Sequence, residues 1–314
     1  MDRLKIIAEY MPLNIRNAIY KLSDFDKNSV QEIRIRVNQT VHLTISGREF
    51  ALSENGNLSD NLKNGINVDL STINEIFNSL CHHSLHSFEK SIQNGYITAD
   101  GGCRIGIGGV ANSDNNDILS MQHICSLNIR IAKEIYNASI ELYNNIYLKN
   151  ENVNLLIAGK VNSGKTTLLR DLCRILSSKY RIALIDERNE ISSVFNGFPQ
   201  NDVGEMTDIL CQYPRHKGME IALRTLSPQI IVCDEISSFK DSNAIEDIYG
   251  NGINMVASTH ANNIEELKNK TFLKNILDKN IFNYIAFIND GNNIGKIKNI
   301  IKLWKIFLFL YYLS

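Results

Sequence analysis

The residues whose types and spacing most clearly indicate chemistry form the loop Gly159-Lys160-Val161-Asn162-Ser163-Gly164-Lys165-Thr166. This stretch matches in full the phosphate-binding pattern GxxxxGK followed by Ser or Thr. Its glycines allow backbone N–H groups to turn inward around phosphate oxygens. The lysine supplies a positive charge to the β- and γ-phosphates, and the threonine hydroxyl is a ligand for Mg²⁺. We therefore predict ATP and Mg²⁺ as cofactors, with ATP bound by the whole loop and by Thr167.

Two further runs place polar side chains where a buried strand would end. PQIIVCDEIS delivers Asp234 and Glu235 to the carboxyl edge, where ligands bind in open parallel sheets. We expect Asp234 to bind Mg²⁺ directly or through another ligand, and Glu235 to be the base that orients and activates water. In MVASTHAN, His260 follows another apolar run and is predicted to contact the γ-phosphate. The alternatives are a solvated acidic pair and an ordinary surface or core histidine.

A third acidic group lies in ALIDERNEI, where Asp186, Glu187 and Glu190 surround Arg188. Each buried and unpaired charge would cost several kcal/mol. We therefore expect these acids to line a cleft, to pair with Arg188 or to face Mg²⁺. Asp186 is predicted as a metal ligand, and Glu187 and Glu190 are further candidates for the general base. The sequence leaves open which acid is the base, and an ordinary solvated strand end is the alternative.

A sheet must position these residues, and from residue 154 onward the sequence has the pattern of an α/β sheet. Short apolar runs alternate with helical stretches of about 10–15 residues, and the runs are NLLIAG, RIALID, QIIVCD, NMVAST and YIAFIN. Continuous apolar runs between helices are typical of parallel strands buried on both faces. Residues 1–145 instead mix short strands and helices. We predict an α/β protein with a smaller N-terminal α+β domain at 1–150 and a RecA-like P-loop NTPase domain at 151–314.

The amino-acid composition indicates a globular protein and argues against some classes of function. Of 314 residues, 44% are hydrophobic and 21% charged, as in ordinary globular proteins. The net charge of −1 argues against a nucleic-acid partner, which would favour a basic stripe. The six cysteines contain no CxxC pair, which favours free thiols in a reducing compartment. The N-terminus shows no signal peptide, so we expect a cytoplasmic protein.

The C-terminal residues 300–313 are strongly apolar. A membrane-spanning helix needs about 20 apolar residues, so this segment is too short to span. We expect a terminal strand or a helix packed on the core, and contact with a membrane surface is the alternative. The role of this tail stays open.

The four motifs, in this order, resemble the secretion-ATPase superfamily, which contains the motors of type II and type IV secretion and of pilus assembly. The resemblance covers residues 154–290. His260 falls on the family's His box, residues 186–190 fall on its Asp box, and ALRTLSPQIIVCDEI resembles its helix and Walker B strand. Those motors usually have Gly at the position of Asp234, so the match indicates a branch of the superfamily.

Within that superfamily, the chain is similar to the stage III sporulation AA family of endospore-forming Firmicutes. The segments that carry this resemblance are EIRIRV, GYITADGGCRIGIGG, SLNIRIAKEI, GKVNSGKTTLLRDLCR, IDERNEI and STHA. The resemblance implies a cytoplasmic ATPase of the mother cell, peripherally associated with the channel that links mother cell and forespore. It also implies a homo-hexamer whose partners are membrane-embedded channel subunits of a sporulation secretion apparatus.

The resemblance also suggests where arginines act. In secretion ATPases the N-terminal domain supplies arginines to the nucleotide of a subunit. Arg104 and Arg130 lie in the matching segments GCRIGIG and LNIRIAK. An arginine placed against developing γ-phosphate charge contributes several powers of ten in rate. The alternative is that both are surface residues of strands.

The sequence leaves three possible functions open. The first is an ATPase that resembles secretion and pilus-assembly motors and drives assembly or transport. The second is a RecA-like, nucleic-acid-dependent ATPase, for which the near-neutral charge is unfavourable. The third is an ATP-binding structural switch subunit with little turnover, which the complete set of motifs disfavours.

Overall fold

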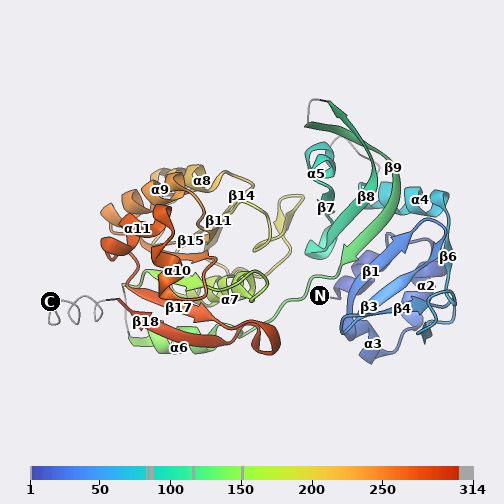
Figure 1. Ribbon diagram of the computed structural model, residues 1–314, viewed down its shortest axis with the longest axis horizontal. Helices are drawn as coiled ribbons and strands as arrows, with labels where there is room; N and C mark the ends of the chain where they lie inside the picture. The colour runs from blue at the N-terminus through green and yellow to red at the C-terminus, as the bar shows by residue number, and fades with distance from the viewer. Residues whose placement is uncertain (1, 83, 85–87, 115–116, 150–151, 304–314) are drawn as a thin grey trace. The chain divides into compact units, whose positions relative to one another are not determined.

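The structure, a computed structural model, describes residues 2–82, 84, 88–114, 117–149 and 152–303. It divides into two compact units (Figure 1), of which the first comprises Met1–Lys133 with Phe195–Gln200 and the second Glu134–Val194 with Asn201–Ser314. This division differs from the expected boundary at residue 150. The physical reason is helix α6 (Ile140–Ile146), whose Leu142 and Ile146 are buried in the core of the second unit.

A seven-stranded antiparallel sheet forms the centre of the first unit, in the order β5-β4-β3-β1-β9-β8-β7. Its strands are β1 (Val30–Arg36), β3 (His42–Ile45), β4 (Arg48–Leu52), β5 (Leu58–Ser59), β7 (Tyr96–Thr98), β8 (Arg104–Asp114) and β9 (Asp117–Arg130). The helices are α1 (Arg3–Ala8), α2 (Leu13–Lys21), α3 (Asp24–Ser29), α4 (Leu70–Leu80) and α5 (Glu89–Gln93), and β2 (Gln39–Thr40) pairs with β6 (Asn67–Val68). Alternate residues of β1, including Ile33 and Ile35, are fully buried in one apolar cluster. This unit is the predicted α+β domain.

The second unit contains a seven-stranded sheet in the order β14-β11-β15-β16-β10-β17-β18. All neighbouring strands are parallel except β17 and β18. The strands are β10 (Leu155–Ala158), β11 (Ile182–Asp186), β14 (Thr207–Cys211), β15 (Ile230–Glu235), β16 (Asn254–Thr259), β17 (Tyr284–Ile288) and β18 (Ile297–Lys302). Five of them are the predicted apolar runs, and β10, β11 and β17 are buried along their whole length. The predicted α/β fold class is confirmed.

Helices cover both faces of this parallel sheet (Figure 1). Helices α6 and α7 (Lys165–Leu176) pack against Leu155 and Ile157 of β10. On the opposite face, Leu156 and Ala158 belong to the core that contains α8 (Arg215–Thr225), α9 (Phe239–Gly250), α10 (Ile264–Lys268) and α11 (Thr271–Asp278). Alternate residues of one strand thus enter opposite cores, as the two-residue period requires. Polar side chains are left to gather at the carboxyl edge.

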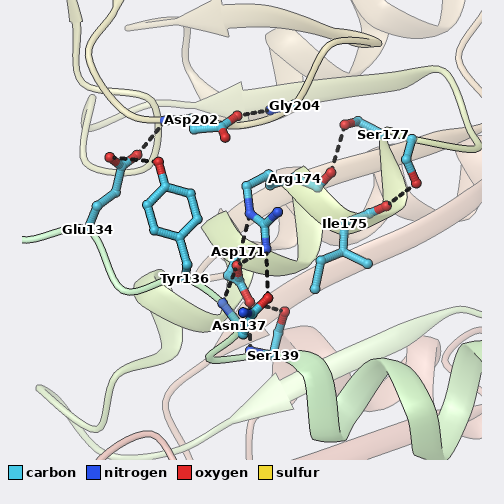
Figure 2. Close-up of polar contacts among 11 residues, drawn as sticks. Glu134, Tyr136, Asn137, Ser139, Asp171, Arg174, Ile175, Ser177, Asp202 and Gly204 are labelled. Atoms are coloured by element: carbon cyan, nitrogen blue, oxygen red, sulfur yellow. Dashed lines mark hydrogen bonds and ion pairs between the residues drawn. The ribbon is translucent and has the colours of Figure 1, made fainter. Parts of the chain in front are cut away.

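The first residues of the second unit, 134–139, are held against helix α7 by hydrogen bonds (Figure 2). The Asp171 carboxylate accepts hydrogen bonds from the backbone N–H of Asn137 at 3.0 Å and of Ser139 at 2.8 Å, and from the Ser139 hydroxyl at 2.8 Å. Arg174 adds an ion pair at 2.7 Å and lies over the Tyr136 ring. Because α7 begins with Lys165 of the predicted phosphate-binding loop, this segment contacts the helix of the predicted nucleotide site directly.

Among the described residues, the structure contains no helix with the length and apolarity needed to cross a membrane. Strand β18 ends at Lys302, so the first residues of the apolar C-terminal segment form the expected terminal strand. The remainder of that segment, residues 304–313, lies outside the described residues.

Candidate nucleotide-binding site

The predicted phosphate-binding loop joins β10 to α7, which is the strand–loop–helix context that the motif requires. Gly164 adopts a φ of +92°, a backbone conformation that residues with a Cβ rarely adopt. A Cβ there would also lie 3.2 Å from the backbone of Gly295. At Gly159, a Cβ would lie 2.6 Å from the Ser163 hydroxyl. Gly164 is therefore needed for the shape of the loop, and a side chain at position 159 would require the Ser163 hydroxyl to move.

A pocket of about 490 Å³ opens at this loop. It is lined by Val161, Asn162, Ser163, Gly164, Lys165, Thr166, Thr167, Arg188, Glu190, Asp234, Glu235, Ser258, His260 and Ile294. Within the described part of the chain, the hydroxyls of Ser163 and Ser258 are buried without a hydrogen-bond partner. Such groups are costly unless something satisfies them, so the pocket fits a polar ligand such as the phosphates of a nucleotide.

The Lys165 side chain contacts its own loop and a histidine of a neighbouring strand end. Its Nζ donates to the backbone carbonyls of Gly159 at 2.9 Å and Lys160 at 2.6 Å, and lies 3.0 Å from His260 Nδ1. His260 Nε2 lies 2.9 Å from Glu235 Oε2. Since an ammonium can only donate, Nδ1 accepts and Nε2–H donates to the carboxylate. Burial lowers the pKa of Lys165, and the charge of Glu235 acts in the opposite direction.

Asp234 is the second-to-last residue of β15, and only 7% of its surface is exposed. Burial raises its pKa to about 6, and the negative charges of Asp186 and Glu190 act in the same direction. A divalent cation would relieve this arrangement of charge. No group of three His, Cys, Asp or Glu side chains in the described ranges could hold a metal by itself. Mg²⁺ usually binds one or two protein carboxylates plus substrate phosphates, so Asp234 with the Thr166 hydroxyl fits it.

Asp186 is fully buried at the end of β11. Its carboxylate accepts hydrogen bonds from the backbone N–H groups of Glu190, Ile191 and Ser192. The Ser192 hydroxyl adds a fourth bond at 2.6 Å. Asp186 therefore shapes the loop that follows β11, and it does not line the pocket. A role for Asp186 as a magnesium ligand stays a prediction.

The other two acids of this loop point to different surroundings. Glu190 lines the pocket, whereas Glu187 forms an ion pair with Arg215 of α8. Arg215 is buried and also pairs with Asp241 at 3.2 Å. Arg188, one of the partners that the sequence allowed for these acids, lines the pocket instead. Glu190 is therefore better placed than Glu187 to be the general base. Glu235 is better placed than both, because it lines the pocket and contacts His260.

The two arginines predicted to act on nucleotide lie next to each other in the first unit. Arg104 of β8 and Arg130 of β9 are directly opposite in the strand register. The guanidinium of Arg104 lies 3.8 Å from the centre of the Tyr96 ring, and Arg130 Nε lies 3.3 Å from Glu32. Like charges opposite one another are unfavourable in a sheet, so these contacts stabilise an otherwise repulsive pair. Their predicted role in the reaction is not tested by these contacts.

One part of the site was not anticipated from the sequence. The loop between β17 and β18 packs on the phosphate-binding loop, where Gly295 N–H donates to the Ser163 carbonyl at 2.9 Å. Lys160 Nζ lies 2.7 Å from Asp290, and Ile294 lines the pocket. The available signal was the turn sequence NDGNN after the run YIAFI. That signal predicts a turn but not what the turn contacts.

Comparisons with known proteins show the family of the chain. The chain matches the family model described as Sporulation stage III, protein AA over residues 1–305. It is 29% identical over 300 residues to "Stage III sporulation protein AA" of Bacillus subtilis (strain 168), and the match covers 94% of each chain.

Solved structures agree on the fold. The ATPase DotB of Legionella pneumophila matches with a TM-score of 0.56 and 13% identity, over 88% of this chain and 77% of DotB. The pilus retraction motor PilT, solved with bound ADP, matches with a TM-score of 0.58 and 13% identity, over 84% of this chain and 76% of PilT. At such identity the likeness concerns the fold, and it confirms the predicted P-loop NTPase fold.

Proposed function

The chain belongs to the family of sporulation stage III, protein AA, and we propose that it binds ATP with Mg²⁺ and hydrolyses ATP in the pocket described above. The observation that carries the proposal is the chain of contacts from Lys165 through His260 to Glu235. These contacts connect a complete phosphate-binding loop to a carboxylate within one pocket. Hydrolysis needs both parts, a cradle for the phosphates and a group that orients the attacking water.

Each side chain has a role that follows from its chemistry. Lys165 and the backbone N–H groups of its loop bind the β- and γ-phosphates. Thr166 and Asp234 hold Mg²⁺, which neutralises charge on the phosphate oxygens. Glu235 accepts the proton of the attacking water. His260 keeps Glu235 and Lys165 at a fixed separation and is close enough to the pocket to contact the γ-phosphate.

We further propose that the working form is a homo-hexameric ring in which Arg104 and Arg130 reach the nucleotide of a neighbouring subunit. The resemblance of the segments GCRIGIG and LNIRIAK, which contain these arginines, to segments of secretion ATPases supports this role. The fold shared with secretion and pilus ATPases supports a motor that drives assembly or transport. The family supports a place in sporulation. There it would lie in the cytoplasm of the mother cell, attached to membrane-embedded channel subunits.

A single set of measurements separates this motor from its alternatives. ATP turnover is measured with and without single-stranded DNA, and molar mass with and without a non-hydrolysable ATP analogue. A motor hydrolyses ATP without DNA and has a ring-sized mass when the analogue is present. Turnover that requires DNA would instead indicate a nucleic-acid ATPase. Binding without turnover would indicate a switch subunit.

A further inference from the structure

Arg188 is a cation of the pocket to which the proposed hydrolysis assigns no role. Arg188 follows β11, is exposed and lines the pocket. Among the described residues its guanidinium makes neither an ion pair nor a hydrogen bond, and its acidic neighbour Glu187 pairs with Arg215 instead. An exposed arginine is ordinarily just solvated. Three features of its surroundings indicate a more specific role.

The first feature is that the loop holding Arg188 is fixed from both sides. Before it, the Asp186 carboxylate accepts the backbone N–H groups of residues 190–192. After it, the Asn189 side chain exchanges two hydrogen bonds with the backbone of Val194, at 2.8 and 2.6 Å. Asn189 itself has a φ of +55°, a conformation that asparagine tolerates better than most residues. The backbone at Arg188 therefore has a defined position at the pocket.

The second feature is a direct connection to the phosphate-binding helix. Arg170 of α7 donates from Nε to the carbonyl of Ile191 at 2.7 Å and from Nη2 to the carbonyl of Glu190 at 2.6 Å. The helix that begins with Lys165 thus holds the loop that presents Arg188. The two pocket cations belong to one rigid frame in the same subunit.

The third feature is the order of the strands. The phosphate-binding loop follows β10, Glu235 ends β15, and β11 lies on the far side of β15 from β10. In hydrolysis the transferred phosphate lies between the phosphate-binding loop and the attacking water. A side chain that follows β11 therefore approaches the nucleotide from the side of its terminal phosphate. The acids Glu190, Asp234 and Glu235 also line this pocket, so a second cation there offsets their repulsion of a triphosphate.

We propose that Arg188 contacts the terminal phosphate of ATP bound in its own subunit and makes the pocket prefer triphosphates to diphosphates. The inference rests on the proposed function, since it assumes that the pocket binds ATP. Guanidinium groups suit this task because they form paired, charge-assisted hydrogen bonds with phosphate oxygens. The assignment is distinct from that of Arg104 and Arg130, which would act on a neighbour.

The test compares the affinities of full-length variants for Mg²⁺–ADP and for a Mg²⁺-bound, non-hydrolysable ATP analogue, measured by calorimetry. Arg188→Gln should weaken the analogue about tenfold to a hundredfold, as expected for a lost charge-assisted hydrogen bond, and leave ADP unchanged. Arg188→Lys keeps the charge and should fall between the parent and Arg188→Gln. Arg224→Gln removes an exposed arginine outside the pocket and should change neither affinity.

The outcomes distinguish this inference from the proposed function. If Lys165→Ala loses both nucleotides while Arg188→Gln keeps both or weakens both equally, the pocket is right and the inference is overturned. If the parent binds neither nucleotide, the proposed function fails and the inference fails with it. An equimolar mixture of Arg188→Gln and Lys165→Ala subunits gives a further check. Return of ATPase activity in that mixture would show that Arg188 serves a neighbour, which overturns the assignment to its own subunit.

Discussion

At the scale of residues, the pocket depends on side chains that hold one another in place. Lys165 contacts His260, and His260 contacts Glu235. A change at one of the three therefore alters the position of the next. A change that keeps the shape of the side chain, such as Glu to Gln, tests the chemistry of the group. A change to Ala removes the structural contacts of the side chain as well.

Lys165→Ala removes the charge that we propose binds the β- and γ-phosphates. We expect ATP binding to become too weak to detect, or weaker by at least about a hundredfold, the size of a lost buried charge contact. Calorimetry with Mg²⁺–ATP measures the affinity. Lys217→Ala is the control, because the Lys217 side chain is exposed on α8, pairs with Glu220 and does not line the pocket. Equal affinity of Lys165→Ala and the parent would mean that the site is misplaced.

Glu235→Gln keeps the shape of the side chain but removes the base. ATP should still bind, and kcat should fall at least about tenfold, the low end for lost base catalysis. Phosphate release at saturating ATP measures this change. Glu205→Gln is the control, since Glu205 is exposed and does not line the pocket. An unchanged kcat in Glu235→Gln would transfer the role of base to Glu187 or Glu190.

The surroundings of a residue could be predicted from the sequence where they are made by its neighbours in the chain, and not where they are made by distant segments. The loop around Lys165 is defined by eight consecutive residues, so its strand–loop–helix geometry was predicted correctly. The partner of Glu187 was not, because Arg215 lies 28 positions along the chain and is delivered by a different helix. The hydrogen bonds of Asp186 could not be predicted from the sequence either. An aspartate at the end of a strand suggested a metal ligand, and its bonds to the backbone of the following loop appear only in the folded chain.

At the scale of elements, the connection between the opening segment of the second unit and α7 rests on one buried carboxylate. Burial raises the pKa of Asp171, but hydrogen bonds from Ser139 and Arg174 outweigh it and hold the pKa below its ordinary value. A carboxyl group with a lowered pKa stabilises the fold above its unfolded pKa of about 3.9. The stabilisation is lost as the pH falls through the lowered value.

Asp171→Ala should therefore reduce the free energy of unfolding at pH 7 by about 3 kcal/mol, since it leaves buried donors unpaired. Urea denaturation followed by circular dichroism measures the difference. The gap between variant and parent should shrink as the pH is lowered below about 4. Glu141→Ala, an exposed acid on α6, is the control and should change stability by less than about 0.5 kcal/mol. Equal stabilities of Asp171→Ala and the parent would show that this contact does not stabilise the fold.

The elements themselves differed in how clearly the sequence marks them. The five central strands of the parallel sheet were predicted because strands buried on both faces are continuously apolar. The edge strands β14 and β18 are only partly buried, so neither was among the predicted runs. Helix α6 precedes the expected boundary at residue 150 but packs in the second unit, because its burial depends on contacts with strands that follow it in sequence.

At the scale of the whole molecule, the question is whether one pocket needs two subunits. Arg130→Ala should lower turnover while the ATP affinity of the isolated subunit is unchanged, since the arginine would act on the transition state. Mixing it with Lys165→Ala, which has an intact arginine and a defective pocket, should restore part of the activity. Phosphate release by the mixture measures the recovery.

The control for this mixture is Arg48→Ala, which removes an exposed arginine from β4 of the same unit and should leave turnover unchanged. Arg104→Ala should behave as Arg130→Ala does, because the two side chains lie on directly opposed positions. No recovery in either mixture would exclude action of these arginines on a neighbouring pocket.

The most direct test of the central claim is the rate of phosphate release per subunit, measured with Mg²⁺–ATP over a dilution series of the full chain. If the chain is an ATPase that works as a ring, the rate per subunit rises with protein concentration, because nucleotide binding that favours the assembled state stabilises it by linkage. Lys165→Ala should release no phosphate at any concentration. A parent rate equal to that of Lys165→Ala would contradict the assignment of ATP hydrolysis to this pocket. A rate per subunit independent of concentration, together with a monomer-sized molar mass in the presence of a non-hydrolysable ATP analogue, would contradict assembly.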